Sequence, residues 1–236
     1  MNALRTAVRG VGDLCITLGV LLLLFLVWQL WWTDVSAGRV QDQLADQVQR
    51  SWTQSAAPVP DPTDPTRPAP VGTRLDVREG ETFALLRIPR FGADYVRPVL
   101  EGVDLDVLDD GIGHYPKSAD PGEVGNFAVA GHRVTYAKPF GQIAELEDGD
   151  PVVVETATAW YVYRVVGRTI VTPNRVDVVL PVPEQPGKRP TQRLMTMTAC
   201  HPQFSARERY VVYSELAERL VKAPGVYPDV LGAPPA

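Results

Sequence analysis

The stretch RLMTMTACHPQFSARERYVVYSEL, residues 193–216, holds two runs of strand-forming residues on either side of a polar loop. The first run is RLMTMTAC (193–200) and the second is RYVVYSEL (209–216). Short runs rich in β-branched and aromatic residues favour β-strands. Cys200 ends the first run, and His201 follows it at once. A cysteine in this position is either a reactive thiol or a small apolar residue in a sheet core, and the residues around it must decide.

Runs of the same texture recur from Thr82 to Leu216, with Gly, Pro, Asp and Asn between them. Helical turns are plausible at only two places, 105–110 and 141–146. Many short strands with few helices predict an all-β domain, either a closed or nearly closed barrel or a sandwich. Strands are expected at residues 83–89, 95–103, 126–133, 151–157, 160–171, 176–181, 193–200 and 209–216, with a further short one at 111–116.

Composition and charge narrow the class of protein. Hydrophobic residues make up 45% of the chain and charged residues 22%, which is typical of a folded globular protein. A net charge of −5 argues against a nucleic-acid binder, which normally carries a basic patch. The two cysteines are Cys15, in an apolar run, and Cys200. They form no disulfide framework, so Cys200 is expected to be a free thiol.

Residues Leu14–Trp32 form an apolar run of nineteen residues without a charge. As a helix this run is about 28 Å long, close to the hydrocarbon thickness of a bilayer. Basic Arg5 and Arg9 precede the run and acidic residues follow it, so the positive-inside rule places the N-terminus in the cytoplasm. A signal peptide cleaved near Ala37 is the alternative, although the run is longer than a usual signal core. Either way, the remainder is expected outside the cytoplasm.

Polar and proline-rich segments separate this run from the strands. A polar stretch with Val40, Leu44 and Val48 at intervals of four suggests a short amphipathic helix, and the simpler interpretation is a solvated stalk. A proline-rich stretch after it is typical of a semi-rigid spacer. The expected divisions are 1–13 (cytoplasmic), 14–32 (transmembrane anchor), 33–56 (stalk), 57–74 (linker), 75–222 (catalytic domain) and 223–236 (flexible tail).

A nucleophilic cysteine needs a nearby base, because the thiolate is the form that attacks. His132 lies near the end of the run NFAVAGHR, as Cys200 lies at the end of its own, so two strand ends at one rim would bring them together. Taken alone, each residue is more often structural. A metal site is disfavoured because no metal-ligand spacing is present, and adjacent Cys200 and His201 rarely ligate one ion. Arg207 and Arg209 share a strand face, and either is a fixed donor for a carbonyl or oxyanion.

Together these residues resemble the sortases, and class E sortases in particular, over roughly Phe83–Leu216. The resemblance rests on GIGHYP (111–116), PGEVGNFAVAGHRVTYAKPF (121–140) and TMTACHPQFSARERYVVY (196–213), in this order and spacing. It implies a closed eight-stranded β-barrel with one or two short helices, preceded by a transmembrane helix. The active site is then expected at one end of a groove.

The resemblance assigns roles residue by residue. Cys200 matches the family nucleophile, His132 the catalytic histidine, and Arg209 the catalytic arginine, whereas Arg207 does not match. The family motif before the cysteine usually reads T-L-x-T-C, and this chain has Met at 197 and Ala at 199. The loss of a hydroxyl at 199 puts substrate contacts there in question. Expected substrate-binding residues are Tyr115, Thr196, Thr198 and Ala199.

The resemblance also implies an activity, partners and a location. A membrane-anchored cysteine transpeptidase of this kind cleaves an LAxTG- or LPxTG-like sorting signal between Thr and Gly. It then transfers the secreted protein to an amine of a lipid II-like cell-wall precursor or of a pilin. No metal or cofactor is expected. Two alternatives remain open: a cysteine endopeptidase in which water resolves the intermediate, and a non-catalytic peptide-binding surface module.

Overall fold

The computed structural model of this chain describes residues 2–54 and 77–232. Within these residues the helices are α1 (Asn2–Gln54) and α2 (Leu105–Asp110), and the 3-10 turns are η1 (Pro89–Phe91), η2 (Ile143–Glu145), η3 (Val176–Val179) and η4 (Asp229–Leu231). The strands are β1 (Thr82–Arg87), β2 (Val96–Glu101), β3 (Ile112–His114), β4 (Gly125–Ala130), β5 (Pro151–Glu155), β6 (Ala159–Val171), β7 (Arg193–His201) and β8 (Glu208–Val221).

The eight strands of the described residues close into a barrel in the order β1-β2-β3-β4-β7-β8-β6-β5. This confirms the predicted closed eight-stranded all-β fold with few helices. β7 lies between β4, with which it pairs in parallel, and β8, with which it pairs antiparallel. The cysteine-bearing strand is therefore held by a hydrogen-bonded neighbour on each side.

The main hydrophobic core fills the barrel. Met195, Met197 and Ala199 of β7 pack there with Phe127 of β4 and Val212 of β8. Burying one such large side chain stabilises a fold by about 1.5–3 kcal/mol, and a one-residue slip would turn the whole set outward. The core therefore fixes the register of β7. Because side chains alternate along a strand, the residues between these three lie on the outer face of the barrel.

The predicted strand at 176–181 is wrong, because these residues form η3 and the turn after it. Val178 packs against Val171 and Val211 in a small cluster on the outer face. Asn126 Nδ2 donates to the carbonyl oxygen of Leu180 at 3.0 Å, which ties the segment to β4. A segment that crosses the face of a sheet can bury alternate apolar residues without hydrogen-bonding to a strand. Its sequence then has the alternating pattern of a β-strand.

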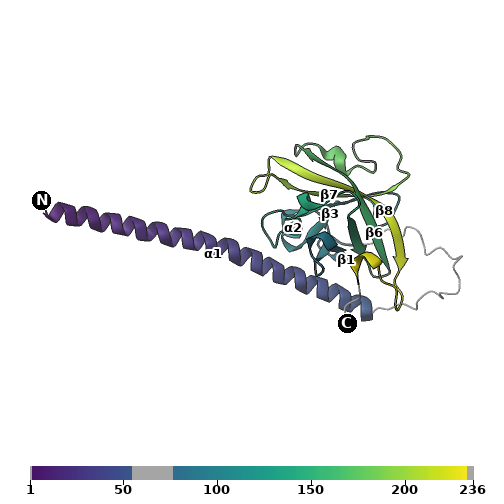
Figure 1. Cartoon of the computed structure of the whole chain (residues 1–236), viewed down its shortest axis with the longest axis horizontal. Coiled ribbons are helices and arrows are strands. Elements are labelled where there is room, and N and C mark those ends of the chain that lie inside the picture. Colours follow the sequence, from purple (N-terminus) through teal and green to yellow (C-terminus); the bar gives the residue numbers. More distant parts are fainter. Residues whose placement is uncertain (1, 55–76, 233–236) are drawn as a thin grey trace.

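Helix α1 is one continuous helix of 53 residues, although the sequence suggested separate membrane and stalk segments. Figure 1 shows its N-terminal half projecting away from the barrel and its C-terminal half lying beside it. Apolar side chains of the projecting half, such as Leu22 and Phe25, are exposed. Among the described residues it is the one helix long and apolar enough to cross a membrane, with a mean hydropathy of 2.4 in its most apolar window.

The C-terminal half of α1 packs on the barrel, which corrects the interpretation of 33–56 as a solvated stalk. Its buried stripe is Ala37, Gln41, Ala45 and Val48, with Ala45 and Val48 in contact with Leu85 of β1. This stripe has helical spacing, but two of its residues are alanines and one is a glutamine, so Val48 is its one larger apolar side chain. Of the three apolar positions that the sequence suggested, Val48 belongs to the stripe, whereas positions 40 and 44 do not. A stripe of this kind is recognised only once its neighbour is known.

The tail expected at 223–236 is packed as far as the structure describes it. Tyr227, Val230 and Leu231 contact the buried cluster of Val153, Trp160 and Val162 at the side of the barrel. The tail is therefore an ordered cover for β5 and β6 up to residue 232, rather than a loose end. The expected proline-rich linker at 57–74 lies outside the described residues.

Candidate active site

Three neighbouring strands reach the same rim of the barrel, and each brings one of the residues predicted to be catalytic. Cys200 of β7 pairs directly with Arg209 of β8. β4 and β7 run in parallel, and the Gly131 backbone N–H donates to the Thr198 carbonyl at 3.1 Å. His132 follows at the next position on the face of Cys200. Because neighbouring strands lie about 4.8 Å apart, this register brings a thiol, an imidazole and a guanidinium to one place.

Cys200 is a free, partly buried thiol on the outer face of the barrel. The side chain of the preceding residue, Ala199, points the opposite way, into the core. The Arg133 guanidinium donates to the Cys200 carbonyl oxygen at 3.3 Å, which fixes the backbone of the nucleophile candidate. The thiol is therefore accessible on a backbone held from both sides, which is what an attacking group requires.

The structure distinguishes Arg209 from Arg207, between which the strand pattern of the sequence could not choose. Arg209 lies in β8, opposite Cys200, and its Nη1 donates to the carbonyls of Ala206 and Glu208 at 3.0 Å each. Both bonds use Nη1, so Nε and Nη2 of the fork can still donate to a ligand. Arg207 precedes the strand in an exposed loop position. The geometry therefore favours Arg209 as the donor beside the thiol.

His132 is held between two side chains that the sequence analysis did not identify. Its Nε2 lies 3.2 Å from Oδ1 of Asp109, at the end of α2. Its ring stacks on that of Tyr136, with centroids 5.0 Å apart and planes at 29°. The negative charge of Asp109, with some burial, raises the pKa of Tyr136 above its ordinary value. The carboxylate fixes the position and tautomer of the imidazole, as orienting groups do for catalytic histidines.

His201 faces away from this group, as expected for the residue after Cys200 on a strand. The Arg133 guanidinium lies 2.6 Å from His201 Nδ1 and over the ring of Tyr210, 5.5 Å from its centroid. Alternation thus divides the rim into two sets of side chains. His201 belongs with Arg133 and Tyr210, not with the thiol.

Tyr115 and Thr198 border the same outer face. The Tyr115 hydroxyl lies 3.2 Å from Thr198 Oγ1, two residues before Cys200 on its face. Thr196 is fully buried, and its hydroxyl donates to Asn126 Oδ1 at 2.9 Å. Tyr115 therefore lies beside the strand of Cys200, whereas Thr196 fastens β7 to β4.

Ala199, an expected substrate-binding residue, lies in the core of the barrel. Its side chain is 3% exposed and packs in the barrel core with Met195 and Met197. A side chain there cannot touch a peptide lying on the outer face. The replacement of the family threonine by alanine removes a hydroxyl from the core, so its consequences act on packing rather than on direct contact.

His114, another histidine of the described residues, lies in a buried hydrogen-bond network away from the thiol. His114 is 2% exposed, with Nδ1 2.5 Å from Glu101 Oε2 and Nε2 2.7 Å from Ser118 Oγ. These buried hydrogen bonds join β3 to β2 and to the turn after β3, which is a structural role.

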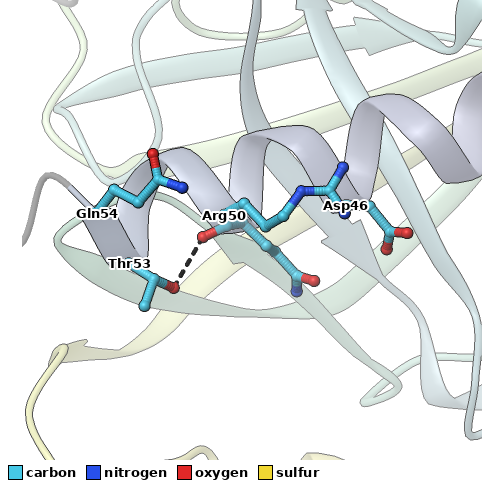
Figure 2. A pocket seen from close by; sticks show the side chains of 5 residues that line it. Asp46, Arg50, Thr53 and Gln54 are labelled. Carbon is cyan, nitrogen blue, oxygen red and sulfur yellow. Dashed lines mark hydrogen bonds between the residues drawn. The ribbon is translucent and has the colours of Figure 1, made fainter.

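Figure 2 shows a pocket lined by Asp46, Gln49, Arg50, Thr53 and Gln54 on the C-terminal turns of α1. It lies on one helix surface and does not include the thiol or His132.

Sequence reasoning missed Asp109 and Tyr136, the two partners of His132. Asp109 precedes the strand of GIGHYP in the chain, and Tyr136 lies within the loop after A-G-H-R. Tyr136 belongs to a segment that carried the family resemblance, residues 121–140, whereas Asp109 lies just before GIGHYP and outside those segments. The contact of Asp109 with His132 depends on how α2 folds over the rim, and that of Tyr136 on the conformation of the loop after His132.

Comparison with known proteins agrees with this arrangement. The family model of the sortase domain matches residues 86–217. The chain is 39% identical over 98% of its length to sortase SrtE1 of Streptomyces coelicolor, of which it spans 62%. It is 35% identical over 89% of its length to SrtE2 of the same organism, of which it spans 82%.

Solved structures of sortases share the barrel. The crystal structure of sortase E1 from Streptomyces coelicolor with a tripeptide in the active site is 39% identical, with a TM-score of 0.59 over 64% of this chain and 97% of that chain. The SrtF sortase from Corynebacterium diphtheriae is 34% identical, with a TM-score of 0.65 over 71% of this chain and all of that chain (100%).

Proposed function

Because the chain belongs to the sortase family, whose members are cysteine transpeptidases, we propose that it joins secreted proteins to an acceptor amine. Its substrate is an LAxTG- or LPxTG-like sorting signal, cut between Thr and Gly through a thioacyl intermediate. The observation that carries the proposal is the convergence of Cys200, His132 and Arg209 from three adjacent strands on one outer face. A barrel that only bound peptides would not need this combination of groups.

In the first half-reaction the Cys200 thiolate attacks the carbonyl carbon of the threonine, and a carbon–sulfur bond forms. Arg209 donates hydrogen bonds to the oxyanion or to the adjacent peptide backbone. The bond to the glycine nitrogen then breaks, and protonated His132 gives its proton to the leaving amine. Since Asp109 engages Nε2 of His132, Nδ1 is the nitrogen available for this transfer.

In the second half-reaction the acceptor amine attacks the thioester. His132 takes a proton from that amine, the carbon–nitrogen bond forms, and Cys200 leaves as the thiolate. One peptide bond is broken and one is made, so no oxidant, metal or cofactor is required. The acceptor we propose is the amine of a lipid II-like cell-wall precursor, with a pilin amine as the second possibility.

The apolar part of α1, residues 14–32, serves in this proposal as a single-pass membrane anchor with the N-terminus in the cytoplasm. Basic Arg5 and Arg9 before the apolar part, and acidic residues after it, support this orientation. The barrel then lies outside the cell, where both a translocated sorting signal and a lipid-linked acceptor are found.

The function is tested with the purified full chain, a fluorogenic peptide containing LAxTG, and triglycine as the amine. We expect mass spectrometry to find the threonine–glycine cut and a new amide to the added amine. Without amine, slow hydrolysis at the same bond is expected. Equal hydrolysis in both conditions would identify an endopeptidase, and binding without cleavage would identify a peptide-binding module. A matched LPxTG peptide tests the contribution of Tyr115, which we expect to favour alanine.

The choice between the arginines gives a separate prediction. Arg209→Ala is expected to lower kcat/KM about 100-fold or more, as the loss of an oxyanion donor does. Arg207→Ala removes the same charge from an exposed loop position nearby and should change kcat/KM less than threefold. The comparison uses initial rates of peptide cleavage with each variant. A larger loss for Arg207 would overturn the assignment.

A further inference from the structure

The loop that follows His132, residues 133–141, has an unusual backbone. Tyr136, Ala137 and Lys138 have φ values of 53°, 59° and 51°, three consecutive residues in the left-handed region. Each such residue other than glycine costs about 1 kcal/mol or more and persists only where its surroundings hold it. The surroundings of this loop therefore carry information about its role.

One end of the loop is fastened to the barrel. The Phe140 backbone N–H donates to the His132 carbonyl at 2.9 Å, and the Phe140 ring is fully buried in the core. The Tyr95 hydroxyl donates to the Pro139 carbonyl. These contacts fix the return of the loop, but they do not reach the residues with left-handed backbone.

Helix α1 holds those residues. Gln41 Nε2 donates to the Tyr136 carbonyl at 2.9 Å, and the glutamine is 1% exposed. Asp34 forms an ion pair with Lys138 at 2.7 Å. A Cβ built on Gly38 would lie 3.7 Å from the Ala137 Cβ, so the helix approaches the loop closely at this glycine. Two polar contacts and one close packing contact therefore join α1 to three successive loop residues.

The same loop residue that Gln41 contacts also touches the imidazole. The Tyr136 ring stacks on His132, and Asp109 contacts the edge of the imidazole at Nε2. A shift of the Tyr136 backbone moves the ring against which His132 rests. A proton donor must lie within a few tenths of an ångström of its productive position, so such a shift matters for rate.

We propose that the segment Asp34–Gln41 of α1 positions His132, with Gln41 and Tyr136 as positioning residues. This inference rests on the proposed role of His132 as proton donor and acceptor. It goes beyond that role because it makes α1, which continues from the apolar anchor, part of the active-site architecture. A solvated tether would leave His132 to be oriented by the barrel alone.

The test compares two glutamine variants in the full-length protein in detergent micelles. Gln41→Glu replaces the amide donor by a carboxylate that faces the Tyr136 carbonyl. Gln43→Glu makes the same charge change at an exposed position two residues along the helix. We expect Gln41→Glu to lower kcat about tenfold with KM for the sorting peptide within twofold, the effect of one lost hydrogen bond expressed on positioning. Gln43→Glu should keep the kcat of the unaltered chain.

A second variant and two further measurements keep the outcome clear. Gln41→Met keeps the volume without a donor and should give a similar loss of kcat while Tm stays close to that of the unaltered chain. An unchanged kcat in both Gln41 variants, a loss confined to KM, or an equal loss in Gln43→Glu would each overturn the inference.

The chain has three histidines, so selective labelling gives a simple spectrum in which His132 is assigned by substitution. The imidazole signal of His132 should move in Gln41→Glu while that of His114 stays. This measurement does not depend on turnover. If the unaltered chain makes no amide product and the His132 signal still moves, the proposed function fails and the positioning role stands. If the product forms and the signal does not move, the positioning role fails alone.

Discussion

Replacing Cys200 with alanine is expected to abolish transpeptidation, with a loss in kcat of at least about 10⁴-fold. The proposed thioacyl intermediate is a bond to Sγ, so no other side chain at the rim can substitute for it. Arg209 and His132 would still bind and polarise the peptide, but they offer no group that forms a covalent acyl link. The measurement is amide product formed from an LAxTG peptide and triglycine, followed by mass spectrometry.

The matched control is Cys15→Ala. This second cysteine is a free, exposed thiol in the apolar part of α1, well before the barrel in the chain. Its removal should leave the rate unchanged and should leave one site for a thiol-reactive probe. Intact-protein mass spectrometry should find the acyl adduct on the unaltered chain and on Cys15→Ala, and not on Cys200→Ala. Product formation by Cys200→Ala at a rate comparable to that of the unaltered chain would refute the role of Cys200 as nucleophile.

Local patterns predicted an all-β domain, and the resemblance to the sortases then supplied the closed barrel and the three candidate catalytic groups. Short β-branched runs mark the strands, and the core-facing Met195 and Met197 alternate with outward threonines in a single stretch of sequence. A cysteine and a histidine at the ends of two such runs indicate one rim, and the family spacing selects Arg209. Each inference uses residues close together in the chain or fixed by their order.

The features that the sequence did not predict depend on tertiary contacts between elements far apart in the chain. VDVVLP imitates a strand because it buries Val178, yet the burial comes from crossing the outside of β6 and β8. Ala199 was expected in the substrate site because it adjoins Cys200, although alternation alone sends it into the core. The long helix α1 packs through Val48, which the sequence suggested, but also through Ala37, Gln41 and Ala45, which are too small or too polar to indicate a buried face.

The environment of His132 is the clearest example. Asp109, Tyr136 and Gln41 come from α2, a loop and α1, and they meet only after the barrel closes. Asp109 and Gln41 have no periodic spacing relative to His132, and Tyr136, four residues after it, lies in a loop rather than a helix. Groups that orient a catalytic residue are often of this kind, because they act through tertiary contact rather than through a motif.

Replacing His132 with glutamine is expected to lower kcat/KM by about 10²–10⁴-fold, the range for loss of a general acid–base group. Glutamine can still donate a hydrogen bond to Asp109, so α2 and the rim should keep their structure. It cannot hand a proton to the leaving amine or remove one from the acceptor. Both half-reactions should therefore slow, and steady-state cleavage should fall with and without triglycine.

His201→Gln is the matched control, because His201 is next to Cys200 in sequence but bonds to Arg133 on the other side of the rim. Its effect on kcat/KM should stay below about threefold, since the altered contacts are those with Arg133 and with the Tyr210 ring, away from the thiol. A thioester substrate separates the roles further. Its thiolate leaving group needs no proton from His132, so His132→Gln should acylate from the thioester much faster than from the peptide. Equal slowing with both substrates would mean that His132 acts on the Cys200 thiol rather than on the leaving group, and the proposed proton path would have to be abandoned.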